Sequence, residues 1–314
     1  MVKPLLWLGA LMMILSPALA QPGAAALYNP KPDITPATRF IQNLAITEPE
    51  AGAEPLSHEG VARIGVYGDS TAAALNVGLQ FWLDRRGNGR ARMGLAELGC
   101  GLLRKGVYRF RGSDHARPEH CRERTSAWRA SITRDQPDIA LVLYGTWEVC
   151  DRKLPGENVW RHPGDPILDE ELRKEMLDAV DMLSAKGALV VWLTHPVNEV
   201  RDLGSGDAPA TSYPESDPLR MARLNDLIRE LPESRPEKVQ ILDLAAYMRT
   251  LPGGELDKDY RPDGIHYSPE GTLRLAHDWL EAETVRLYRE ARSARSSATG
   301  NGRESAQLPK PSHP

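Results

Sequence analysis

Three short strings, far apart in the chain, carry side chains that could together perform acyl chemistry. They are Gly68-Asp69-Ser70, Gly145-Thr146-Trp147-Glu148 and Asp263-Gly264-Ile265-His266. A serine hydroxyl becomes a nucleophile when a histidine accepts its proton and a carboxylate orients that histidine. Because Asp263 and His266 are three residues apart, one loop can hold both. The pattern predicts Ser70 as nucleophile, His266 as general base and Asp263 as the partner of His266.

Each string also has an ordinary structural interpretation. Ser70 follows an apolar run and opens a helical pattern, so its hydroxyl could serve only as a helix cap. Pro262-Asp263-Gly264 is a good turn sequence, in which His266 would be incidental. Taken alone, neither string decides the matter. The order, spacing and local setting of the strings together favour the hydrolytic interpretation.

Apolar strands alternate with amphipathic helices in the segment that carries these strings. Apolar runs predict strands at residues 61–67, 138–144, 188–193 and 239–242, and stripes at helical spacing predict helices at 72–85, 168–183 and 224–231. Ser268 and Pro269 predict the cap and first residue of a last helix that ends near Arg289. This alternation predicts a parallel, doubly wound α/β sheet, with its ligand at the carboxyl ends of the strands.

The two ends of the chain have different compositions. Lys3, an apolar run at 5–15 and Ala18-Leu19-Ala20 are typical of a signal peptide cleaved after residue 20, with a retained anchor as the alternative. Residues 21–59 are predicted to be a linker, 60–291 the folded domain, and 292–314 a disordered tail. We therefore expect a periplasmic or secreted protein.

Composition and cysteine content narrow the class further. Hydrophobic content of 41%, charged content of 26% and a net charge of -4 are ordinary for a globular protein and predict no nucleic-acid partner. Export permits disulfides. We prefer a Cys100–Cys121 bridge, which closes a polar and irregular segment, over Cys100–Cys150. The chain has no CxxC pair, so no structural zinc site is expected.

Gly-Asp-Ser after the first strand and Asp-x-x-His before the last helix resemble the SGNH, or GDSL, hydrolases over residues 60–290. The resemblance implies a three-layer α/β/α fold with a mainly parallel, five-stranded, flavodoxin-like sheet, and it repeats the roles of Ser70, Asp263 and His266. It also implies that the backbone N–H groups of Ser70 and Gly99 hold the oxyanion, with Gly101 as the second choice to Gly99.

The remaining string departs from that family. Gly145 keeps its place, but Trp147 stands where the family has Asn. The indole could form a wall of the acyl pocket or donate its N–H to the oxyanion. We favour the wall, because an indole is bulky and has one donor with one direction.

Gly-x-Trp-Glu-Val, followed by Asp-Arg, resembles a particular branch of the family. These are the extracytoplasmic SGNH domains attached to multi-span membrane acyltransferases that decorate cell-surface carbohydrates, and Cys100 and Cys121 fit their cysteine placement. The resemblance implies an O-acyl esterase or acyltransferase for acylated carbohydrate, without cofactor or metal. We expect a monomeric, stand-alone version that works with a separate membrane acyltransferase. The alternative is a non-catalytic carbohydrate-binding or scaffold protein on a degenerate SGNH fold.

Other polar residues near the strings have weaker interpretations. Glu148 and Asp151 could bind sugar hydroxyls, although such residues are more often surface acids. His195 follows a predicted strand, and we favour a hydrogen-bonded structural role over substrate contact. A metal site from His195, Asp263 and His266 is disfavoured, because it would compete with the triad.

Overall fold

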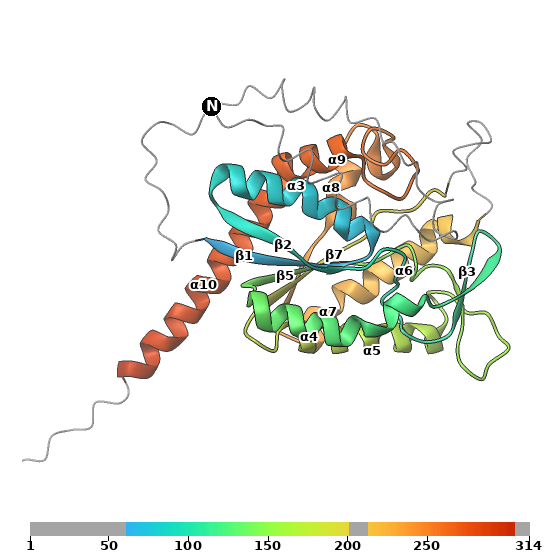
Figure 1. The fold of residues 1–314 in the computed structure, drawn as a ribbon, viewed down its shortest axis with the longest axis horizontal. Helices are drawn as coiled ribbons and strands as arrows, with labels where there is room; N and C mark the ends of the chain where they lie inside the picture. The colour runs from blue at the N-terminus through green and yellow to red at the C-terminus, as the bar shows by residue number, and fades with distance from the viewer. Residues whose placement is uncertain (1–60, 201–212, 305–314) are drawn as a thin grey trace, which may run out of the picture. The chain divides into compact units, whose positions relative to one another are not determined.

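The computed structural model describes residues 61–200 and 213–304 (Figure 1). The predicted signal peptide and linker lie outside these residues. In the described part of the chain, no helix combines the length and the apolar character that crossing a membrane requires.

Five strands form one sheet, and every neighbouring pair in it is parallel. In sheet order they are β2 (Gly89–Ala96), β1 (Ala62–Gly68), β5 (Ile139–Leu143), β7 (Leu189–Leu193) and β8 (Val239–Leu242). After β1 the chain adds β2 on one side, and β5 then begins the other side. The carboxyl ends of β1 and β5 therefore flank the point where the strand order reverses, which is where such sheets bind ligands. The predicted fold class is confirmed.

The position of each strand follows from its side chains. β5 and β7 are buried at every residue, and central parallel strands covered on both faces are continuously apolar. β2 instead alternates, with Arg90 and Arg92 exposed and Ala91 buried, as suits the edge of a sheet.

Helices cover both faces of this sheet (Figure 1). One face packs on α4 (Arg124–Asp135), α5 (Pro166–Leu183), α6 (Pro218–Arg229) and α7 (Leu231–Ser234). The other face packs on α3 (Ser70–Arg86), α8 (Leu244–Thr250), α9 (Pro269–Leu275) and α10 (Glu281–Glu304). Successive residues of β7 enter opposite clusters, Trp192 the first and Leu193 the second. The sheet is thus the middle of three layers.

The end of the chain corrects the predicted tail. Ser268 caps α9 as predicted, because its hydroxyl accepts the Gly271 N–H at 2.9 Å. A π-helical turn, η6 (Ala276–Leu280), then leads into α10, which continues to Glu304. The helix was expected to end near Arg289, so the tail prediction is wrong for residues 292–304. Residues 292–304 hold two Ala and three Arg, which favour helix, beside three Ser and two Gly, which do not, so their composition alone did not reveal the continuation of α10. Residues 305–314 lie outside the described part.

A second, antiparallel sheet forms from segments that precede and follow the Gly145 string in the sequence, and it was not predicted. Its strands are β4 (Ser113–Ala116), β3 (Val107–Phe110) and β6 (Asp151–Lys153). The segment between Cys100 and Cys121 was expected to be irregular. Strands of three or four residues with several polar side chains give too short a pattern to recognise. The described residues also form the 3-10 helices η3 (Glu119–Glu123), η4 (Pro214–Ser216) and η5 (Gly254–Leu256).

Candidate functional site

Ser70 is the first residue of α3, directly after the carboxyl end of β1. The cap of this helix is Asp69, whose Oδ1 accepts the Thr71 N–H at 2.8 Å and the Thr71 hydroxyl at 2.6 Å. The Ser70 hydroxyl is therefore not the cap. It lies 2.8 Å from Nε2 of His266. The structure thus separates the two interpretations of Gly-Asp-Ser: Asp69 caps the N-terminus of α3, and the Ser70 hydroxyl faces His266.

Asp263 and His266 form one self-contained turn. Oδ1 of Asp263 accepts the backbone N–H groups of Ile265 (2.8 Å) and His266 (2.6 Å), while Oδ2 lies 2.6 Å from Nδ1 of the His266 ring. Burial by itself would raise the pKa of Asp263, but the hydrogen bonds and charge of His266 outweigh it and lower that pKa to about 2. The ionised carboxylate can only accept, so Nδ1 carries the proton and Nε2 is left to accept from Ser70.

Gly264 lets this turn approach the loop that follows β7. Its φ of 76° lies in the left-handed region, and a Cβ there would lie 1.7 Å from the Glu199 carbonyl oxygen. The Glu199 N–H in turn donates to the Gly264 oxygen at 3.0 Å. Only glycine fits this place, which explains the Asp-Gly sequence of the string.

The structure therefore brings Ser70, His266 and Asp263 together in one hydrogen-bonded chain. These residues come from two segments almost 200 positions apart, joined here at the carboxyl end of β1. An acyl carbon at Ser70 Oγ would meet a nucleophile with a base already oriented by a carboxylate.

The predicted oxyanion glycine lies on a loop that we call the β2 loop, residues 97–103. The Glu97 N–H donates to the Gly68 oxygen at 2.9 Å, which ties the start of this loop to the end of β1. Gly99 has a φ of 74°, and a Cβ there would have no atom of the described chain within 4 Å. The loop thus begins beside Ser70 with an open position at Gly99. The oxyanion role of Gly99 stays a prediction.

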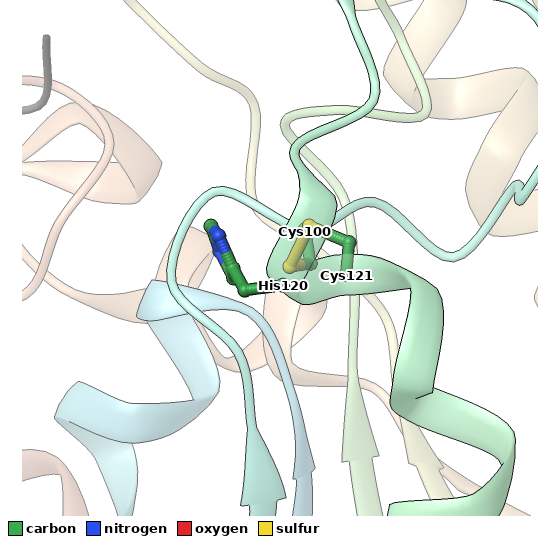
Figure 2. Close-up of side chains that lie close together, drawn as sticks. All are labelled: Cys100, His120 and Cys121. Carbon is green, nitrogen blue, oxygen red and sulfur yellow. A yellow bond between two sulfur atoms is a disulfide. The ribbon is translucent and has the colours of Figure 1, made fainter.

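A disulfide joins Cys100 of the β2 loop to Cys121, with the two Cα atoms 5.6 Å apart. This is the preferred pairing, and Cys150 is free and buried, with its sulfur 3.3 Å from the Thr146 oxygen. His120 lies alongside the disulfide (Figure 2), and its Nε2 is 3.0 Å from the Leu98 oxygen. The ligand-type atoms of Cys100, His120 and Cys121 lie within 4.8 Å of one another, but the disulfide occupies both sulfurs.

The Trp147 indole packs against aromatic side chains of the small antiparallel sheet. Its ring centroid lies 5.4 Å from that of Tyr108 and 5.1 Å from that of Phe110, both on β3. The half-buried indole also belongs to the apolar cluster of Ile265, the residue before His266. Such a fixed ring beside the triad loop suits the predicted pocket wall.

Gly145 has a packing role that the sequence did not reveal. A Cβ there would lie 2.1 Å from Cγ of His195, so the imidazole rests on the bare backbone after β5. His195 is fully buried, and its Nδ1 is 2.7 Å from the Pro196 oxygen. Burial lowers the pKa of His195 to about 3, so its ring is neutral near pH 7. These contacts favour the structural interpretation of His195.

Glu148 was expected to bind sugar or face solvent, and it does neither. Its side chain is 2% exposed, and Oε1 accepts the Leu102 N–H of the β2 loop at 2.5 Å. Burial, followed by the nearby charge of Asp69, raises the pKa of Glu148 to about 7. Asp151 pairs with Arg220 at 2.8 Å. The available signal was position: Glu148 lies directly before the apolar pair Val149-Cys150, where a surface acid is out of place.

Arg261 is another buried residue that sequence reasoning missed. Its guanidinium is fully buried and donates to the oxygens of Val197 (2.5 Å) and Ile265 (3.1 Å). It also donates to the Glu255 oxygen (3.0 Å) and to Oδ1 of Asn198 (3.0 Å). Arg261 therefore links the turn of Asp263 and His266 to the segment after β7.

Comparison with known proteins gives a family. The model of the family described as "SGNH domain (fused to AT3 domains)" matches residues 43–281. No curated protein matches the chain.

Solved structures with a similar fold come from several bacteria. The periplasmic domain of a lipopolysaccharide acetyltransferase from Salmonella ser. Paratyphi A is 14% identical, with a TM-score of 0.42 over 76% of this chain and 86% of that one. A GDSL-like lipase from Bacteroides thetaiotaomicron VPI-5482 is 13% identical, with a TM-score of 0.45 over 82% and 98%. A Slackia heliotrinireducens protein described as an SGNH hydrolase is 16% identical, with a TM-score of 0.43 over 69% and 95%.

Proposed function

The chain belongs to the family of SGNH domains that are fused to AT3 domains, and we propose that it is a serine-dependent O-acyl esterase or acyltransferase. Its proposed substrates are ester-linked acyl groups of cell-surface carbohydrate. The observation that carries the proposal is the chain of contacts from Ser70 Oγ to His266 Nε2 (2.8 Å) and from His266 Nδ1 to Asp263 Oδ2 (2.6 Å).

The reaction follows from these contacts. Ser70 Oγ attacks the acyl carbon while His266 Nε2 takes the hydroxyl proton, and the backbone N–H groups of Ser70 and Gly99 hold the oxyanion. When the ester C–O bond breaks, His266 returns the proton to the leaving oxygen and the acyl group stays on Ser70. Water or a sugar hydroxyl then attacks this acyl ester, His266 takes its proton, and Ser70 regains that proton as it leaves. No step requires a cofactor.

The proposed location is the periplasm or the exterior of the cell. The Cys100–Cys121 disulfide supports it, because disulfides persist in oxidising compartments. The proposed donor of acyl groups is a membrane acyltransferase, since the family is described as fused to AT3 domains. The domain is proposed to act as a monomer.

Labelling by a fluorophosphonate probe tests the nucleophile. We expect the folded protein to form a covalent adduct, Ser70→Ala to form none, and Ser126→Ala to label like the unmodified protein. Ser126 is an exposed serine of α4 whose hydroxyl bonds only within its own turn, to Glu123. Folded protein that never labels would instead support the non-catalytic carbohydrate-binding or scaffold alternative, which the Trp147 substitution motivates.

Product analysis separates hydrolysis from transfer. The protein is incubated with p-nitrophenyl acetate, with and without candidate glycans, and the acetyl group is followed by mass spectrometry. Acetate as the product in every mixture identifies an esterase, whereas an acetylated glycan identifies a transferase. Neither product should form with Ser70→Ala.

A further inference from the structure

The backbone of the β2 loop is held by buried charged side chains from two other elements. Arg124 of α4 donates to the oxygens of Gly101 (2.7 Å) and Leu102 (2.5 Å). Glu148, in the loop after β5, accepts the Leu102 N–H at 2.5 Å. Both backbone groups of Leu102, its N–H and its carbonyl oxygen, are therefore hydrogen-bonded to buried charged side chains. Leu102 lies three residues from Gly99.

Glu148 and the β2 loop are in direct van der Waals contact as well. A Cβ at Gly101 would lie 2.8 Å from Oε1 of Glu148 and 2.9 Å from Cβ of Trp147. The bare backbone of Gly101 is what allows the loop to rest on these two residues. Glu148 thus lies between the loop of the proposed oxyanion glycine and Trp147, the proposed wall of the acyl pocket.

The surroundings of Glu148 make a carboxyl group costly there. The charged and titratable groups that face it are Asp69 before α3, Tyr144 after β5, Cys150 before β6, Arg124 on α4 and Arg152 on β6. No hydrogen-bond partner for Oε2 exists within residues 61–200 and 213–304. Burying an ionisable group with one unpaired oxygen costs free energy that an apolar side chain of equal size would avoid. The favourable contact that this carboxyl group does make is the hydrogen bond that Oε1 accepts from the Leu102 N–H.

We propose that Glu148 is a positioning residue of the proposed acyl transfer: by accepting the Leu102 N–H, it orients the β2 loop so that the Gly99 N–H faces the oxyanion formed at Ser70. The inference rests on the proposed function, and it assigns a task to a residue that touches neither substrate nor triad. What matters is a hydrogen-bond acceptor at this place, more than a negative charge.

Two substitutions of Glu148 by side chains of nearly the same size distinguish the effect of the hydrogen-bond acceptor from that of the charge. Glu148→Gln keeps an oxygen that can accept from Leu102, whereas Glu148→Met has none. We expect the Gln variant to retain kcat on p-nitrophenyl acetate within about threefold, and the Met variant to lose about 30- to 100-fold, since a misplaced catalytic group can cost about 100-fold. KM should change little in either, because the loop acts on the transition state. Glu281→Met is the matched control, as Glu281 is equally buried but bonds Arg86 and Asn88 instead.

Hydrogen exchange of residues 97–103 reports the loop without any reaction. Exchange should quicken in Glu148→Met and stay near the unmodified rate in Glu148→Gln and Glu281→Met. If Glu148→Met does not fold, Gly101→Ala replaces it, because its Cβ would push the same contact apart, and the same losses are expected.

Labelling at Ser70 keeps the two proposals distinct. If the unmodified protein labels at Ser70 but the Met and Gln variants react alike, the positioning role is wrong and the proposed function stands. If the folded, unmodified protein never labels at Ser70, the proposed function fails, and the positioning role fails with it. Gly101→Ala that labels and exchanges like the unmodified protein would also overturn the inference.

Discussion

Two loops meet beside Ser70, and a buried arginine holds each in a different way. The triad loop, residues 257–267, contains its own arginine: Arg261 lies two residues before Asp263 and bonds Ile265 inside the same loop. The β2 loop has one internal backbone hydrogen bond, from the Cys100 N–H to the Glu97 oxygen, and is otherwise held by Cys121, Arg124 and Glu148, which belong to other elements. The turn of Asp263 and His266 is bonded within itself, and Arg261 ties it to Val197, Asn198 and Glu255, whereas the β2 loop depends mainly on the elements around it.

The two loops contribute different groups to the proposed active site. The triad loop presents side chains, Asp263 and His266, that are already bonded to each other. The β2 loop presents a backbone N–H, whose direction depends on every contact that holds the chain. Damage to the triad loop should therefore remove the base, whereas damage to the β2 loop should leave the base in place and weaken only the stabilisation of the oxyanion.

Asp263→Asn should have the largest effect, because it breaks the triad loop at its centre. The amide can donate to Nδ1 and so favour the wrong tautomer of His266, in which Nε2 carries the proton and cannot act as base. We expect kcat on p-nitrophenyl acetate to fall by about 1,000-fold or more. Steady-state assays measure this, with circular dichroism to show that the fold is retained. A loss below about tenfold would remove Asp263 from the mechanism.

Arg261→Met and Arg124→Met compare the two supports directly. Each leaves buried carbonyl oxygens without their donor, at about 1–3 kcal/mol apiece, so both should lower the free energy of unfolding by several kcal/mol in chemical denaturation. Only Arg261→Met should disturb the hydrogen bond between His266 Nδ1 and Asp263. The low-field proton NMR signal of that bond should vanish in Arg261→Met and persist in Arg124→Met. Equal behaviour of the signal in both variants would show that the loops are not independent.

The same difference explains which parts of the site could be predicted. The Asp-x-x-His turn closes within four residues, so a short stretch of sequence contains the hydrogen bonds between Asp263 and His266. The main strands were predictable because β5 and β7 are buried on both faces and are therefore apolar throughout. Gly-Asp-Ser likewise places Ser70 after β1 from a short pattern, whereas the Cys100–Cys121 pairing was preferred because it closes a polar segment.

The supports of the β2 loop could not be predicted in this way. Arg124 lies 22–23 residues and Glu148 46 residues from the backbone groups that they bind, and nothing local marks either as the partner of the β2 loop. Their partners are peptide groups, which every residue has, so no residue type signals the contact. The small antiparallel sheet was missed because its strands are short, and α10 was ended too early because polar composition was read as disorder.

Glu148→Gln should change how the free energy of unfolding depends on pH, which tests the support of the β2 loop apart from activity. Burial and Asp69 raise the pKa of Glu148 to about 7, against 4.5 for an ordinary glutamate. Between these values the folded protein binds a proton that the unfolded chain has lost, so ionising Glu148 destabilises the fold as pH rises. Relative to the unmodified protein, the Gln variant should gain little stability at pH 5 and up to about 3 kcal/mol at pH 8. Urea denaturation at the two pH values measures the gain, and an equal gain at both would refute the charge argument.

Trp147→Phe should have the smallest effect, although this residue stands at the family's Asn position. The substitution keeps most of the apolar bulk and deletes the indole N–H. Because Tyr108 and Phe110 pack against the ring from the small sheet, its fixed position is explained without any catalytic hydrogen bond. We expect kcat on acetyl esters to fall less than about tenfold, whereas a true oxyanion donor would cost about 100- to 1,000-fold. Trp160→Phe is the control, since that indole stacks with Arg109 and Lys153 on the small sheet.

Acyl-chain preference tests the wall itself. Trp147→Ala opens the space in front of Tyr108 and Phe110, so butyryl and hexanoyl esters should gain relative to acetyl, while Trp147→Phe should keep the original preference. If the wall is the whole role of Trp147, the ratio of kcat/KM between long and short esters changes with side-chain volume and not with the loss of the N–H. A loss of several hundred-fold on every ester in Trp147→Phe, with the fold intact, would make the indole an oxyanion donor. The β2 loop would then share the stabilisation of the oxyanion with a side chain, and the two loops would differ less in what they contribute.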